Sequence, residues 1–207
     1  MPKNAHDNQN PGGLFPCLRL SLSRKHFSAF FPLLQSGCLV QCPKPLSVEA
    51  FLLSLPGFPG ATILDGIQTV FLDGRPVDDI KAATLEPDCE LALSAAMPGA
   101  LGAVMRRGGY YAAMRGHITF QEQEHETIQG AFCVTVKLFN LLLSQVGPSL
   151  LEHGIVLGSE ELAGLANSFE SGISRLEWKG QDIAPGEFSS LLESLPNRVR
   201  AQLVFKV

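Results

Sequence analysis

The residues best suited to bind a charged ligand gather in one glycine-rich stretch, residues 98–116. Its arginines can donate paired hydrogen bonds to a phosphate or a carboxylate, and its glycines let backbone N–H groups approach an anion closely. Its two tyrosines, the only ones in the chain, could stack on a ring or seal an interface with a partner. The candidate binding residues are Arg106, Arg107, Gly108, Gly109, Tyr110, Tyr111 and Arg115.

The same stretch has a second interpretation, as a linker between two domains. Its glycine spacing matches neither the phosphate-binding loop nor the dinucleotide-binding fingerprint. Glycines also occur where chain segments pack tightly, which requires no ligand. Ligand pockets, on the other hand, favour domain interfaces. Residues 100–116 are therefore either a connector that binds a protein partner or a small anionic ligand, or a connector alone.

Other groups of reactive side chains are weaker candidates. One polar loop combines a histidine with three glutamates, Glu122, Glu124, His125 and Glu126. This loop suits either acid–base and metal chemistry or simple exposure to solvent. Cys38 and Cys42 resemble half a zinc site, but no second Cys or His pair has the right spacing, so we expect free, mostly buried thiols and no metal. No serine lies in a nucleophile-elbow pattern and no HExxH motif is present, so the sequence assigns no catalytic residue and no cofactor.

Composition places the chain among folded proteins with an ample core. It has 207 residues, of which 45% are apolar and 17% charged, and its net charge is −4, so a bulk attraction to nucleic acid is not expected. No stretch approaches the roughly 18–20 uninterrupted apolar residues of a membrane span. Residues 1–16 have the character of a polar, disordered lead and not of a secretory signal. We therefore expect a cytoplasmic protein that binds neither nucleic acid nor membrane.

Hydrophobic periodicity and turn residues predict the elements of the N-terminal half. Strands are expected at residues 17–23, 37–42, 67–72 and 90–96. Ser47 is suited to cap a helix that ends at Pro56-Gly57. Asp73-Gly74 signals a tight turn. The order is strand, strand, helix, strand and strand.

Two short motifs within these elements carry a family likeness. Val70-Phe-Leu-Asp-Gly-Arg-Pro-Val77 is a strand with a glycine turn, and Pro87-Asp88 precedes the strand Glu90-Leu-Ala-Leu93. Both resemble the corresponding parts of the β-grasp sulphur carriers of thiamine and molybdopterin synthesis. The resemblance implies a ubiquitin-like unit over residues 17–99. Members of that family work through a C-terminal Gly-Gly that is adenylated and thiolated, whereas here Ala96-Met-Pro-Gly99 continues into more protein.

Residues 117–207 are predicted to form a second small α+β domain. Its segment Leu176-Glu-Trp-Lys-Gly180 echoes Val70-Phe-Leu-Asp-Gly74, which indicates either a diverged repeat or the chance similarity of strands that end in a glycine turn. The predicted organisation is thus an α+β protein with a ubiquitin-like β-grasp unit, a connector and a second domain. The function that fits is a non-enzymatic binding or assembly module with its site at the connector. The alternatives are an enzyme or cofactor-handling protein with a pocket there, and a carrier processed after Arg106-Arg-Gly-Gly109.

Overall fold

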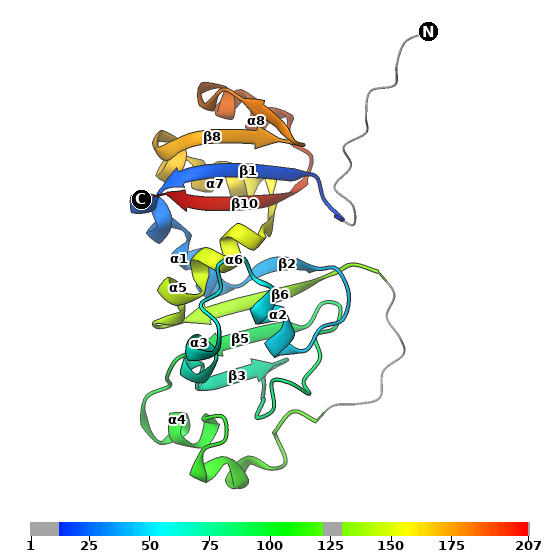
Figure 1. Cartoon of the computed structure of the whole chain (residues 1–207), viewed down its shortest axis with the longest axis vertical. Coiled ribbons are helices and arrows are strands. Elements are labelled where there is room, and N and C mark those ends of the chain that lie inside the picture. Colours follow the sequence, from blue (N-terminus) through cyan, green and yellow to red (C-terminus); the bar gives the residue numbers. More distant parts are fainter. Residues whose placement is uncertain (1–12, 122–129, 207) are drawn as a thin grey trace.

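The computed structural model describes residues 13–121 and 130–206, and in this range the chain is an α+β protein built on one mixed sheet (Figure 1). The strands are β1 (Cys17–Ser23), β2 (Cys38–Cys42), β3 (Thr69–Leu72), β4 (Arg75–Pro76), β5 (Glu90–Ser94), β6 (Phe132–Phe139), β7 (Ile155–Gly158), β8 (Ile173–Trp178), β9 (Gln181–Ile183) and β10 (Arg198–Lys206). The α-helices are α1 (Phe31–Ser36), α2 (Val48–Ser54), α3 (Ala61–Gly66), α4 (Gly99–Met105), α5 (Leu142–Gln145), α6 (Gly147–His153), α7 (Ser159–Phe169) and α8 (Phe188–Ser194). The 3-10 turns are η1 (Arg24–Phe30), η2 (Tyr110–Arg115), η3 (Glu170–Gly172) and η4 (Pro185–Glu187).

The two halves of the sheet match each other in how their strands pair. The strand order is β4-β3-β5-β6-β2-β7-β10-β1-β8-β9, and the antiparallel contact of β2 with β7 lies at its centre. Moving outward from that contact, each half has an antiparallel pair, then a parallel pair, then two antiparallel pairs. Helix α2 follows β2 and helix α7 follows β7, so the helices that follow the central strands also correspond.

The sheet pairs several strands with partners that are distant in the sequence. Strand β1 lies between β10 and β8, and β6 lies between β2 and β5. The range 17–99, predicted as one unit, therefore includes a strand whose two neighbours come from the C-terminal part of the chain. The physical reason is that alternating side chains define which face of a strand is buried but do not specify its partner.

The two edge hairpins turn in the same way. Asp73-Gly74 joins β3 to β4 with φ values of 50° and 73°, and Lys179-Gly180 joins β8 to β9 with φ values of 50° and 81°. Positive φ at both central residues is the backbone of a two-residue hairpin turn whose twist matches that of the strands. The Asp73-Gly74 turn is thus confirmed. The predicted cap is confirmed as well, since the Ala50 N–H donates to Ser47 Oγ at 3.2 Å.

One face of the strands builds the core. In β6 the buried residues are Phe132, Val134, Val136 and Leu138, which alternate with half-buried ones. All five cysteines are free, as predicted. Cys38 and Cys42 are buried in β2, and burial raises the pKa of each thiol to about 12, so neither is a ready thiolate nucleophile or ligand. Within residues 13–121 and 130–206, no helix combines the length and apolar character that a membrane crossing requires.

His153 reinforces the centre of the sheet, where β2 and β7 pair at only two positions. Its Nε2 lies 3.2 Å from the carbonyl oxygen of Gln41 in β2. Its own carbonyl, at the end of α6, accepts hydrogen bonds from Arg200 and Gln202 in β10. One residue therefore links both halves of the sheet, through the ring on one side and through its backbone carbonyl on the other.

Acidification should weaken the fold through His153. Burial lowers the pKa of this imidazole below its ordinary value. The stability it contributes is therefore complete above the unfolded pKa of about 6.5 and declines as the pH falls toward the folded value. We expect urea titrations to show a lower free energy of unfolding at about pH 5.5 than at about pH 7.5. The His153→Gln side chain retains a donor toward Gln41 but does not titrate, so the variant's free energy of unfolding should depend less on pH. An equal pH dependence in the wild type and the variant would contradict the role given to His153.

Candidate functional site

The predicted binding segment lies at one edge of the sheet. Helix α4 and turn η2 occupy the end of the molecule beyond β3 (Figure 1). The two halves of the sheet meet at β2 and β7, which are several strands away. The structure therefore places residues 100–116 outside the contact between the halves, and not at an interdomain junction. The segment is part of the chain that leaves the end of β5 and returns to the start of β6.

A buried arginine holds this segment together. The side chain of Arg115 is 1% exposed. Its Nη2 donates to Asp78 Oδ1 at 2.7 Å and to the Arg106 carbonyl at 3.2 Å, and its Nε donates to the Val104 carbonyl at 2.7 Å. Its Nη1 donates to Thr119 Oγ1 at 3.2 Å. These acceptors occupy the guanidinium from within the protein, so Arg115 organises the segment and does not face an external ligand.

Arg107 and Gly108 attach the segment to the rest of the molecule. The backbone N–H of Arg107 donates to the Gln68 carbonyl at 2.7 Å, and its guanidinium donates to the Leu64 carbonyl at 2.9 Å. The Gly108 N–H donates to Asp78 Oδ1 at 3.0 Å. The Asp78 carboxylate therefore accepts hydrogen bonds from both Gly108 and Arg115 and anchors the segment. The sequence did not identify Asp78 as part of the site; the feature that could have indicated it is the Asp78-Asp79 pair after the Asp73-Gly74 turn.

Tight packing and backbone conformation account for two of the glycines. A Cβ on Gly102 would lie 1.8 Å from the Met97 carbonyl oxygen, so only glycine fits at this point of α4. Gly108 has a φ of 60°, in the left-handed region that glycine adopts without strain. The packing role that the sequence analysis left open is thus realised at Gly102.

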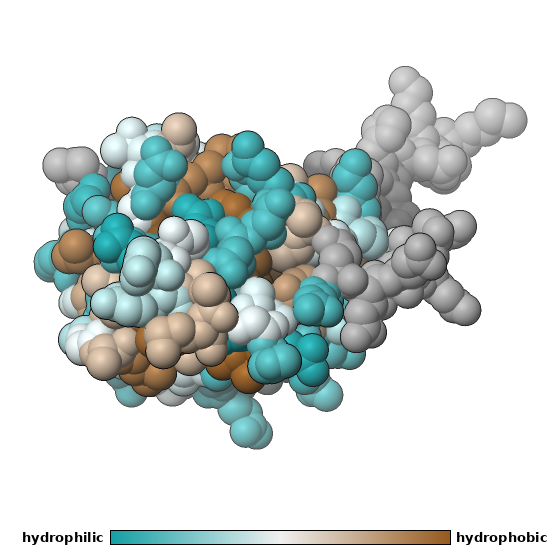
Figure 2. All heavy atoms as spheres, turned by 90° about the horizontal axis from the view of Figure 1, so that it is seen from below, coloured by the Kyte–Doolittle hydropathy of each residue, from teal (hydrophilic) through white to brown (hydrophobic). Residues whose placement is uncertain are grey.

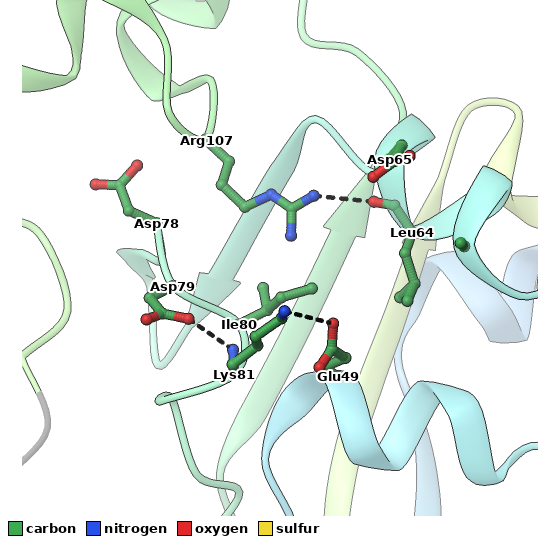
Figure 3. Close-up of a pocket in the computed structure, with 9 residues that line it drawn as sticks. Glu49, Leu64, Asp65, Asp78, Asp79, Ile80, Lys81 and Arg107 are labelled. Carbon is green, nitrogen blue, oxygen red and sulfur yellow. Dashed lines mark hydrogen bonds and ion pairs between the residues drawn. The ribbon is translucent and has the colours of Figure 1, made fainter.

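A cavity of about 310 Å³ lies beside Arg107 (Figure 3). Its lining residues are Glu49, Ala61, Leu64, Asp65, Asp78, Asp79, Ile80, Lys81 and Arg107. Lys81 contacts Glu49 at 4.0 Å, and Asp79 Oδ1 accepts from the backbone N–H groups of Lys81 and Ala82, as a capping side chain does. The four carboxylates outnumber the two cations, so the lining does not favour an anion.

The outer side of the segment is unusually apolar. Eight large hydrophobic side chains are exposed in the described part of the chain, and five of them fall between residues 101 and 118. These five are Leu101, Tyr110, Tyr111, Met114 and Ile118, and we call them the connector patch. Figure 2, which views this end of the molecule, shows hydrophobic residues among hydrophilic ones on the surface. Tyr110 is 91% exposed, Arg106 is exposed as well, and the two tyrosine rings meet edge to face with centroids 5.1 Å apart.

The remaining predicted residues add no second site. Glu122, Glu124, His125 and Glu126 lie outside the described residues. Among the residues that the structure describes, no cluster of three or more His, Cys, Asp or Glu side chains could hold a metal ion. Gly109 packs against Arg106, with a hypothetical Cβ 3.1 Å from its carbonyl oxygen. Of the seven predicted binding residues, the structure thus leaves Arg106, Gly108, Tyr110 and Tyr111 exposed.

Comparisons with protein-family models, with curated proteins and with solved structures find no match to this chain. The site must therefore be interpreted from its own chemistry.

Removing the Arg115 guanidinium should release the segment from the sheet. Arg115→Ala leaves the Asp78 carboxylate without its cation, which costs on the order of 2–3 kcal/mol, less than a fully buried pair because Asp78 is partly exposed. We expect faster hydrogen exchange at the Gly108 amide and a lower free energy of unfolding. Arg106→Ala, at an exposed side chain in the same segment, is the matched control and should leave both unchanged. A protected Gly108 amide in Arg115→Ala would contradict the role of this pair.

Proposed function

We propose that the protein is a non-enzymatic binding or assembly module that docks a protein partner through the connector patch. The observation that carries the proposal is the concentration of five of the eight exposed large hydrophobic side chains in residues 101–118. Exposed apolar groups that cluster, as opposed to scattered ones, are typical of surfaces that associate with another protein. Tyrosine, methionine and arginine, the residue types found here, are enriched at such interfaces.

The geometry favours a protein partner over a small anionic ligand. The Arg115 guanidinium donates to acceptors within the protein. The Arg107 guanidinium donates to the Leu64 carbonyl beside a cavity whose lining has four carboxylates and two cations. An anion entering there would meet repulsion from those carboxylates. The segment that carries the patch is held by hydrogen bonds that Gly108 and Arg115 donate to Asp78, so a partner would not have to order the segment on binding.

We further propose that one half of the sheet is a β-grasp unit with a rearranged chain order. Across the sheet, five strands lie side by side in the order β2, β6, β5, β3 and β4. The pair β6–β5 is parallel, and helix α2 follows β2 in the chain. This is the arrangement of a ubiquitin-like unit in which β6 takes the place expected for residues 17–23. The arrangement supports the resemblance carried by Val70 to Val77. The matching pairing types of the other half support the idea of a diverged repeat.

The same arrangement argues against a processed carrier. Cleavage after Gly109 would separate β6 from the sheet, and β6 pairs with β2 at five positions and with β5 at five positions. Four of its side chains are buried. We therefore expect the native protein to keep residues beyond Gly109, and intact-mass measurement of protein from its own host checks this. A mass that ends at Gly109 would support the carrier instead.

Removing the apolar groups of the patch should abolish partner binding while leaving the fold intact. We expect Tyr110→Ser combined with Met114→Ser to lose proteins that the wild type retains from host lysate, because both side chains are exposed and make the most accessible part of the patch. Since exposed substitutions usually change stability by less than about 0.5 kcal/mol, the unfolding temperature should not move. Leu141→Ser, at a side chain 65% exposed and outside the patch, is the matched control. Equal retention by the double variant, measured by quantitative mass spectrometry, would refute the docking surface.

A further inference from the structure

A second surface, unrelated to the connector patch, lies on the strands of the other half of the sheet. In β1 and β10 the buried residues point to one face, as Leu18, Leu20, Val199 and Ala201 do. The residues between them form the opposite face, which Figure 1 views with β8, β1 and β10 in front of α7. Arg19 and Arg198 on this face are exposed. Ser21 on this face is buried and the end of α6 contacts Arg200, so the part of the face that is open to a ligand is the part that carries Arg19 and Arg198.

The strand register brings three arginines together on this face. Strands β1 and β10 are parallel, with Cys17 opposite Arg200 and Arg19 opposite Gln202. Arg19 is thus a diagonal neighbour of Arg200, at about 7–8 Å between backbones. Arg198 precedes Arg200 by two residues on the same strand, which separates them by about 7 Å. Burial raises the pKa of the Cys17 thiol on this face; the charges of Arg200 and Arg19 oppose that rise, and the charge of Glu177 adds to it.

One carboxylate lies beside these arginines, since Glu177 of β8 is the direct cross-strand partner of Arg19. The Arg175 guanidinium contacts Asp182 at 2.7 Å and, at the longer distance of 3.7 Å, Glu177, so Arg175 shares both carboxylates of this face. Among the described residues, Arg19, Arg198 and Arg200 form no ion pair with a carboxylate. Arg200 also donates to the His153 carbonyl, which fixes its position. A chain with a net charge of −4 therefore presents a local excess of positive charge here.

We propose that Arg19, Arg198 and Arg200 form a binding site for a ligand with several linked phosphate groups, such as a polyphosphate chain. Guanidinium groups match phosphate oxygens with paired hydrogen bonds, and three of them at this spacing suit a ligand that presents more than one anionic group. The strands hold the side chains on a rigid base, so little ordering is needed on binding.

A nucleic acid is the less suitable polyanion for this surface. Single strands are held by bases that stack on aromatic rings in addition to phosphate contacts. The outward positions of these strands carry no aromatic ring, since Trp178 lies opposite Leu18 and so belongs to the other face. The site also lies six strand positions from β3, so it neither requires nor competes with the connector patch.

The test is calorimetric titration of the full chain with sodium tripolyphosphate at low ionic strength. We expect saturable binding that weakens as salt is added. Arg19→Gln and Arg198→Gln should each reduce the affinity about tenfold, in line with the loss of one charge-assisted hydrogen-bonded group. Arg75→Gln, an exposed strand arginine at the other end of the sheet, is the matched control and should bind as the wild type does. Arg200 is left unchanged because it also holds the end of α6.

The location of binding is checked independently by amide chemical shifts. Tripolyphosphate should move the signals of residues 17–21 and 198–202 and leave those of residues 101–118 in place. Absence of saturable binding, unchanged affinity in the Arg19→Gln/Arg198→Gln double variant, or shifts confined to the connector would each overturn the proposal. Tighter binding of single-stranded oligothymidylate than of tripolyphosphate at the same residues would overturn the choice of ligand. None of these results depends on whether the connector patch binds a protein.

Discussion

The parallel pairing of β5 with β6 is the constraint on which the candidate site depends. Parallel neighbours cannot be joined by a tight turn, because the chain must travel back from the end of one strand to the start of the next. Here the return covers residues 95–131, and the connector patch is part of it. Such a crossing segment normally buries its apolar side on the sheet. In this chain its first part lies beyond the edge strand instead, where Asp78 holds it and its apolar side chains face outward.

A fixed anchor explains how an exposed apolar segment can persist without collapsing onto the sheet. Burying the Arg115 charge is costly unless it is paired and hydrogen-bonded, and Asp78 together with two carbonyls and a hydroxyl accepts four hydrogen bonds from it. That arrangement defines one conformation of the loop, because any other leaves a buried cation unpaired. The arginine that first suggested ligand binding is thus what positions the exposed tyrosines.

Local features of the fold could be predicted from the sequence because they depend on local chemistry. The alternation in Cys17–Ser23, the Asp73-Gly74 turn and the Ser47 cap all follow from side-chain period, positive φ and an orphan backbone donor. The partners of each strand could not be predicted, because β1 pairs with a strand some 180 residues away in the chain. In that pairing Cys17 lies opposite Arg200. The burial of Arg115 depends on that same long-range geometry. Its sequence environment, rich in glycine and arginine, suits an anion site equally well.

The arginines of β1 and β10 could be recognised in the sequence, but their proximity to each other could not be predicted. Each was visible in the sequence as the outward residue of an alternating strand, in Leu18-Arg19-Leu20 and in Arg198-Val199-Arg200. Only the parallel register makes them neighbours, since an antiparallel or shifted pairing would place Arg19 elsewhere. Strand β1 lies six positions from β3, or about 30 Å at the usual strand spacing. That separation exceeds the screening length of about 8–10 Å at 0.10–0.15 M salt, so charge at one surface has little direct influence on the other at that ionic strength. The two proposed surfaces can therefore act at once, with an anion held on the face of β1 and β10 while the connector engages a protein beyond the β3–β4 edge of the sheet.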